Sequence, residues 1–152
     1  MTRTLRHFAF GIVSLLLTGC NDTVISSVPD SYVNLQLNLT TTYPTFRNNP
    51  YSYLLFEKPI LVTDAVGYGG ILVYCGVESY FAYDLCCPYE HKRKIKIRPN
   101  SDSKLEFKFT CDSCKTIYDV SSGFGYPVSG PSKEALRRYK AVLNGDILYI
   151  SR

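Results

Sequence analysis

The sequence predicts an all-β protein, built as an antiparallel sandwich or barrel. Its 13 tyrosines and 8 phenylalanines favour strands, and its 8 prolines and 10 glycines favour the turns between them. Several short segments alternate apolar with polar residues, as strands with one buried face do. The dipeptide Asn144-Gly145 lies between two such segments and is the strongest short hairpin signal in the chain. Short strands at this spacing are typical of antiparallel sandwiches and barrels.

The first half of the predicted domain contains one clear strand and three apolar runs. Residues Tyr32–Leu39 alternate, with Val33, Leu35 and Leu37 on the apolar face, and the following Thr-, Asn- and Pro-rich segment Thr40–Tyr53 is predicted to be a loop. The apolar runs come next, at Tyr53–Val62, Gly70–Tyr74 and Ser79–Tyr83. The last run leads directly into a pair of cysteines.

The second half is predicted to contain two hairpins. In the first, Arg93–Arg98 should place Ile95 and Ile97 inward, Asn100-Ser101-Asp102 should turn the chain, and Lys104–Thr110 should return. The inward residues of the returning strand are Leu105, Phe107 and Phe109. In the second hairpin, Tyr139–Leu143 and Asp146–Ile150 flank the Asn-Gly turn.

The N-terminus has the pattern of an exported bacterial lipoprotein. Arg3 and Arg6 precede an apolar stretch that is too short to span a bilayer. It ends in Leu17-Thr18-Gly19-Cys20, which resembles the lipobox, where the cysteine receives a diacylglycerol. We therefore expect a signal peptide over 1–19, lipidation of Cys20, a polar tether over 20–30 and one domain over 31–152. The mature protein would be held on a membrane by acyl chains, facing the periplasm or the cell exterior.

Charge indicates few further partners. The formal net charge of +4 falls to about +2 when Arg3 and Arg6 leave with the signal, so no nucleic-acid partner is expected. The basic run His91–Arg98 is interpreted as the solvated edge of a hairpin rather than as a lipid contact. No later apolar run approaches 18 residues, so the lipid is expected to be the anchor.

The cysteines that remain after Cys20 suggest a metal site. Cys111 and Cys114 have the two-residue spacing that lets two thiolates bind one metal. Cys86 and Cys87 are adjacent, and their side chains should point apart on an extended backbone, so one of the two is expected at the site. Cys75 lies in an apolar run and is expected to be a buried thiol.

The cysteine loops resemble those of the Rieske iron–sulfur domain, in which Cys-x-His and Cys-x-x-His loops hold one [2Fe–2S] cluster. Cys87-Pro88-Tyr89 matches the first loop, Cys111–Asp119 the second, and Gly130-Pro131 the Gly-rich third loop that covers the cluster. Exported Rieske-like lipoproteins of gut-type bacteria have the same appearance. The resemblance spans Gly70–Ile150 and implies the Rieske fold, with Cys87 rather than Cys86 at the site.

The ligand set departs from the family. Tyr89 and Cys114 stand where the two histidines should be, and a Rieske centre needs two histidines on one iron. The chain has only His7, within the expected signal, and His91. With one histidine in the mature chain, an enzyme is the least supported class.

Three occupants of the site remain open. Cys87, Cys111 and Cys114 could hold a [2Fe–2S] cluster with Cys86 or Tyr89 as fourth ligand, for electron transfer to an unidentified redox partner or for redox sensing. The same three cysteines and His91 could bind zinc, or two of the cysteines could form a disulfide in an oxidising exterior. Secretory export of an unfolded chain counts against a cluster assembled in the cytoplasm, whereas the family resemblance favours the cluster.

Overall fold

The computed structural model describes residues 26–100 and 107–152. The expected signal peptide, Cys20 and most of the tether lie outside the described residues, as do Ser101, Asp102 and Leu105 of the first predicted hairpin. Within the described part, the chain forms eleven strands and one short helix, α1 (Pro44–Arg47), so the predicted all-β class is confirmed. No helix of this part is long and apolar enough to cross a membrane.

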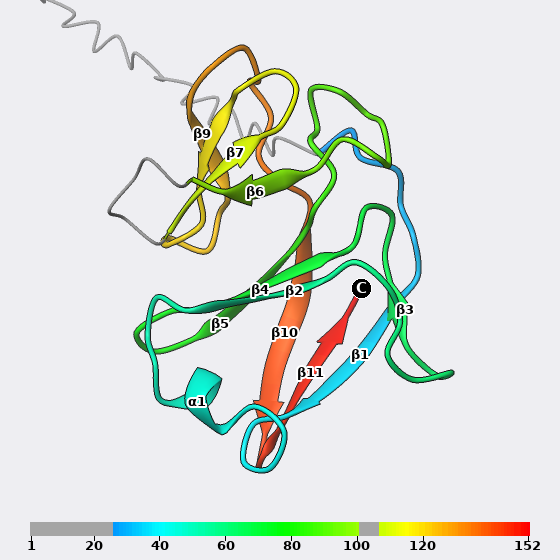
Figure 1. Cartoon of the computed structure of the whole chain (residues 1–152), viewed down its shortest axis with the longest axis vertical. Coiled ribbons are helices and arrows are strands. Elements are labelled where there is room, and N and C mark those ends of the chain that lie inside the picture. The colour runs from blue at the N-terminus through cyan, green and yellow to red at the C-terminus, as the bar shows by residue number, and fades with distance from the viewer. Residues whose placement is uncertain (1–25, 101–106) are drawn as a thin grey trace, which may run out of the picture.

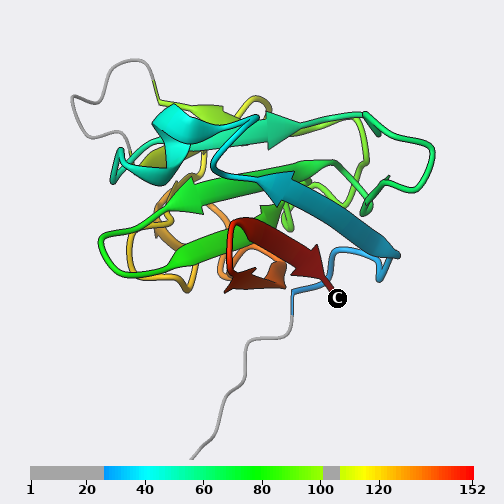
Figure 2. The same ribbon diagram turned by 90° about the horizontal axis from the view of Figure 1, so that it is seen from below.

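Seven strands form one antiparallel sheet that curls into a nearly closed barrel (Figures 1 and 2). In sheet order they are β2 (Tyr53–Phe56), β4 (Ile71–Cys75), β5 (Tyr80–Asp84), β10 (Arg138–Asn144), β11 (Ile147–Ser151), β1 (Val33–Asn38) and β3 (Ala65–Val66). The hairpin expected around Asn144-Gly145 is present as β10–β11, and Gly145 has a positive φ of 59° at its turn. Strand β1 pairs with β11, and its alternating residues point into the barrel.

A second, smaller antiparallel sheet lies at one end of the barrel (Figure 1). In sheet order its strands are β6 (Ile97–Pro99), β7 (Lys108–Cys111), β8 (Ile117–Asp119) and β9 (Tyr126–Ser129). Both cysteine loops belong to this end of the molecule. The first connects β5 of the large sheet to β6, and the second connects β7 to β8.

Strand β4 is buried along its whole length because its two faces contribute to two different cores. Ile71 and Val73 point into the barrel core, whereas Leu72 and Tyr74 point into a second core beneath the small sheet. Successive side chains of a strand point to opposite faces, so a continuous apolar run fits this position. The second core includes Cys87 and Cys111, together with Leu85, Ile97, Phe109, Tyr118 and Leu136.

The structure differs from the sequence-based expectation in three places. Strand β6 begins only at Ile97, because the Ile95 N–H donates to the Lys92 carbonyl in a turn that interrupts the predicted strand. Strand β2 ends at Phe56, and the rest of the apolar run Tyr53–Val62 is exposed. Helix α1, with Pro44 in its first turn, lies inside the predicted loop.

The described end of the expected tether, residues 26–30, packs on the domain. Val28 is buried, and its carbonyl accepts a hydrogen bond of 3.2 Å from Arg137. The Asp30 carboxylate forms ion pairs with Arg137 and Arg152. This segment is therefore part of the folded unit.

Candidate metal centre

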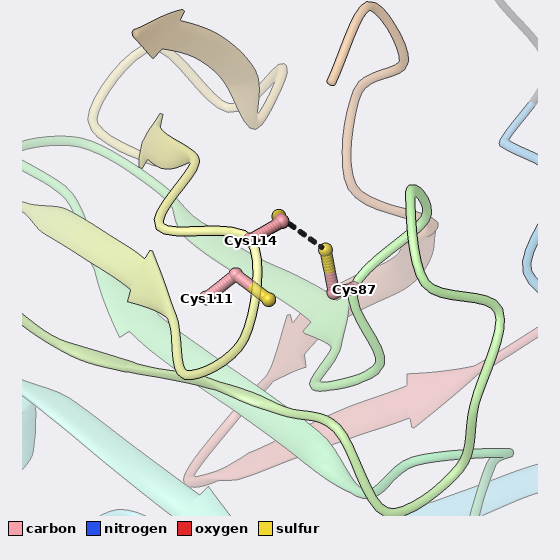
Figure 3. Close-up of side chains that lie close together, drawn as sticks. All are labelled: Cys87, Cys111 and Cys114. Carbon is pink, nitrogen blue, oxygen red and sulfur yellow. Dashed lines mark hydrogen bonds between the residues drawn. The ribbon is translucent and has the colours of Figure 1, made fainter. Parts of the chain in front are cut away.

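Three cysteine side chains from the two loops converge at the edge of the second core (Figure 3). The sulfurs of Cys87, Cys111 and Cys114 all lie within 4.8 Å of one another, as expected for thiols that share one metal. The Cys87 and Cys114 sulfurs are 3.7 Å apart, far beyond the roughly 2.05 Å of a disulfide bond. All five cysteines of the described residues are free thiols.

The first loop is shaped by hydrogen bonds centred on Cys87. The Cys87 carbonyl accepts the N–H groups of Glu90 and His91 at 3.2 and 3.1 Å, which closes a tight turn. The Cys87 N–H donates to the Ile95 carbonyl at 3.2 Å, so the returning chain holds the cysteine from the other side. His91 takes a positive φ of 53° to make this return. The sulfur is fixed on the buried side of the loop.

The second loop closes in the same way around Cys111. Its carbonyl accepts the Lys115 N–H at 3.2 Å, and its N–H donates to the Thr116 carbonyl at 2.9 Å. Lys115 has a positive φ of 60°, which reverses the chain within the loop. This compact turn brings Cys111 and Cys114 to one side.

A third loop, from the end of β9 to β10, packs on the second. Gly130 has a positive φ of 101°, and a Cβ there would lie 2.5 Å from the Thr116 Cα. The Ser132 N–H donates to the Thr116 hydroxyl at 3.2 Å. The loop expected to cover the site therefore lies against Thr116, two residues after Cys114.

Two hydroxyl groups lie beside the thiols. The Tyr118 hydroxyl is 3.4 Å from the Cys87 sulfur, and the Thr116 hydroxyl is 3.2 Å from the Cys114 sulfur. Burial and the bond to Cys87 raise the pKa of Tyr118, so this hydroxyl stays protonated. It can therefore donate a hydrogen bond to a thiolate. Such donors orient metal ligands and stabilise their negative charge.

The thiols differ in their ease of ionisation. Burial raises the pKa of Cys111 to about 12. Burial also acts to raise the pKa of Cys114, but hydrogen bonds from the Thr116 hydroxyl and N–H and from the other two cysteines outweigh it, so the pKa is lowered. Thiolates and not thiols bind metals, so occupation of the site must release protons.

The other residues proposed as ligands lie outside this group. The Cys86 sulfur points to backbone carbonyls, 3.4 Å from that of Lys92, as expected for the neighbour of Cys87. The His91 ring faces the N-terminal segment, with Nε2 2.5 Å from the Ser27 hydroxyl, and Tyr89 is half exposed. Among the described histidines, cysteines and acidic residues, none joins the three thiols as a fourth ligand.

Asp84 supports the first loop and was not recognised from the sequence. Its buried carboxylate accepts N–H bonds from Tyr68 and Gly69 at 2.9 Å and from Cys86 at 2.7 Å, and the Tyr139 hydroxyl at 2.7 Å. Burial raises the pKa of Asp84, and these four donors oppose that rise. The sequence signal for this role is an acidic residue within the apolar run Tyr80–Leu85, because a buried carboxylate needs hydrogen-bond donors around it.

The site offers three sulfur donors, which suit a soft or borderline metal ion. No family model and no curated protein matches the chain. The likeness to the Rieske domain therefore depends on the residues of the three loops alone.

Proposed function

We propose that the protein is an exported lipoprotein whose Cys87, Cys111 and Cys114 thiolates bind a single metal ion, with zinc as the best-fitting metal. The compactness of the group carries this proposal. Tetrahedral ligands at a zinc–sulfur distance of about 2.3 Å are about 3.8 Å apart. The Cys87–Cys114 separation is 3.7 Å, and no pair exceeds 4.8 Å.

The role proposed for the ion is to clamp the two cysteine loops together. Cys87 belongs to the connection out of the large sheet, whereas Cys111 ends β7 of the small sheet and Cys114 lies in the β7–β8 loop, so one ion would link the two loops. A site with three protein ligands keeps a position for water or for a ligand from a partner. The protein would then act as a structural or binding module on the membrane.

A [2Fe–2S] centre for electron transfer or redox sensing is the second candidate. It is favoured by the covering loop at Gly130, which resembles the third Rieske loop, and the hydroxyls of Tyr118 and Thr116 lie where they could donate hydrogen bonds to cluster-bound sulfurs. Two irons spread their ligands further than one ion does, so a cluster requires the thiols to move apart. With thiolates in place of both histidines, its potential should approach the roughly −400 mV of all-cysteine clusters rather than the Rieske range.

Metal analysis of anaerobically purified protein, with a visible spectrum, distinguishes these candidates. One zinc per chain without colour supports the single-ion site, and iron with acid-labile sulfide supports the cluster. Cys87→Ser, Cys111→Ser and Cys114→Ser should each lose the metal. Cys75→Ser is the matched control, because Cys75 is a buried thiol of β4 in the barrel core, outside the group. Metal-free protein with a Cys87–Cys114 disulfide would contradict both candidates.

The anchoring part of the proposal is tested separately by intact mass. Protein extracted from membranes should begin at Cys20 and carry a diacylglycerol. A chain that still begins at Met1 would contradict the lipoprotein assignment and leave the metal result unaffected.

A further inference from the structure

The turn between β2 and β3 exposes three consecutive apolar side chains. Ile60, Leu61 and Val62 are 62%, 60% and 105% exposed. Scattered apolar residues are ordinary on a protein surface, but a contiguous group indicates a contact surface. We call these three residues the apolar tip.

The apolar tip is held in this exposed arrangement by Asp64. The Asp64 carboxylate accepts the N–H groups of Ile60 and Leu61 at 3.1 and 2.8 Å. The Asp64 N–H donates in turn to the Leu61 carbonyl at 3.1 Å. The tip is therefore ordered before it meets a partner, which lowers the entropy lost on binding.

A basic cleft of about 480 Å³ lies beside the tip. Pro59 and Asp64, which flank the tip, line it together with Arg93, Lys94 and Lys96. The Arg93 side chain is fixed there, because its Nε donates to the Tyr68 carbonyl at 2.5 Å and its guanidinium lies over the Tyr68 ring.

Three basic and two acidic side chains line the cleft, so the lining has a formal net charge of +1 with the Asp64 charge counted. The Glu57 carboxylate pairs with Lys96 and Arg98, and the Asp64 carboxylate accepts the two N–H bonds of the tip. Arg93 and Lys94 are exposed and lie in the turn that replaces the predicted strand, so the strand alternation that favoured a solvated hairpin edge over a lipid contact does not apply to them. They leave positive charge at the rim of the cleft, next to the apolar tip.

We infer that this face docks on an anionic lipid bilayer. The apolar tip would enter the boundary between headgroups and acyl chains, and Arg93 and Lys94 would bind headgroup phosphates. An apolar end with a basic rim fits a bilayer surface, which presents the same two layers.

The course of the N-terminus supports a bilayer as the occupant. The segment that leads into β1, in which Val28 is buried, brings Tyr32, 72% exposed, into the lining of the same cleft. Cys20 lies six residues before Ser26, and the next residue, Ser27, contacts Pro88 and His91 of the first cysteine loop, so the lipid would be attached within a reach of about 20 Å from that loop. This support depends on the proposed lipidation of Cys20, whereas the tip and the cleft do not.

A single tryptophan reports the insertion directly, because the chain contains none. The Val62→Trp substitution is made in a lipid-free protein of residues 21–152. This length contains both sheets and both cores. With vesicles of phosphatidylcholine and phosphatidylglycerol, the tryptophan emission should shift to the blue and be quenched by brominated acyl chains. Val77→Trp, in the exposed β4–β5 turn, should show neither effect and serves as the control.

Sedimentation with vesicles tests both halves of the surface. Replacing the tip residues by serine, or Arg93 and Lys94 by glutamate, should weaken partitioning by roughly tenfold or more. Lys133→Glu with Lys140→Glu makes the same charge change on exposed sites elsewhere and should have a smaller effect. Binding to pure phosphatidylcholine vesicles should be at least roughly tenfold weaker than to the anionic ones.

Two results would overturn this inference. One is an unshifted Val62→Trp emission with anionic vesicles, and the other is equal partitioning of the wild type and the tip variant. Neither readout depends on acylation, because the chain tested carries no lipid, and neither uses the metal site, because none of its three cysteines lies in the tip or lines the cleft. Failure here is therefore distinguishable from failure of the proposed function.

Discussion

The hydroxyl of Tyr118 lies 3.4 Å from the sulfur of Cys87, although 31 residues separate them in the chain. Tyr118 is fully buried in β8, and its ring packs in the second core. A residue of the small sheet thus contacts the cysteine of the first loop directly, which couples the position of the thiol to the packing of the core.

Tyr118→Phe should weaken metal binding about tenfold without unfolding the protein, because it removes one hydroxyl and keeps the buried ring. A competition titration with a chelator measures this affinity. Tyr83→Phe is the control, since the Tyr83 hydroxyl is buried in the same core but donates to the Val120 carbonyl. Equal losses for the two variants would mean that the Tyr118 hydroxyl acts on packing alone.

Gly130→Ala should destabilise the protein by about 2 kcal/mol or more, because the new Cβ meets the Thr116 backbone and the φ is positive. It should also weaken metal binding, since Thr116 contacts Cys114. Gly145→Ala has a positive φ but nothing within 4 Å of the new Cβ, so it isolates the backbone strain of about 1 kcal/mol. Urea unfolding measures both. Equal destabilisation by the two substitutions would show that the third loop is not packed tightly on Thr116.

Asp84→Ala should destabilise the protein by about 3 kcal/mol or more, because it leaves two buried N–H donors, one part-buried N–H donor and the buried Tyr139 hydroxyl without an acceptor. Tyr139→Phe removes one of these donors and should have a smaller effect. Chemical denaturation of both variants tests the order. If Tyr139→Phe were the more damaging change, the carboxylate would not be the centre of this network.

Glu57 should give the protein an acid-dependent stability that can be measured. Hydrogen bonds from Arg98 and then Lys96 lower the pKa of Glu57 from 4.5 to about 2. A carboxyl group with a lowered pKa stabilises the fold above its ordinary pKa, and this contribution is lost as the pH falls from about 4.5 towards 2. The side chain is partly exposed, so the effect should stay below about 1 kcal/mol.

Glu57→Gln should flatten the dependence of unfolding free energy on pH between 4.5 and 2. The variant and the wild type should converge at the acid end of this range. An unchanged slope would mean that the ion pairs of Glu57, which join the end of β2 to β6, add no stability in solution.

The sequence predicts the parts of the fold whose signals are local. The alternation of Val33, Leu35 and Leu37 predicts a half-buried strand, and Asn144-Gly145 predicts the final hairpin. The pairing of β1 with β11 brings together segments from opposite ends of the domain, and no local pattern specifies it. The alternation of Arg93–Arg98 is misleading because a turn at Lys92–Ile95 interrupts it.

The three converging thiols could be predicted from their spacing and from the resemblance to a known pair of loops. The hydrogen bonds of Asp84, which support the first loop, could not be predicted. Asp84 contacts Tyr139 only because β5 pairs with β10. The same holds for the apolar tip. Residues 60–62 extend an apolar run, and only the end of β2 at Phe56 shows that they lie outside the sheet.

X-ray absorption at the edge of the bound metal tests the central claim most directly, because it counts the ligands of the metal. We expect three sulfur neighbours at about 2.3 Å and one lighter neighbour, with no second metal nearby. Cys114→Ser should lower the sulfur count to two or abolish binding. A metal with no more than one sulfur ligand, or a second metal atom within bonding distance, would contradict a single ion held by Cys87, Cys111 and Cys114.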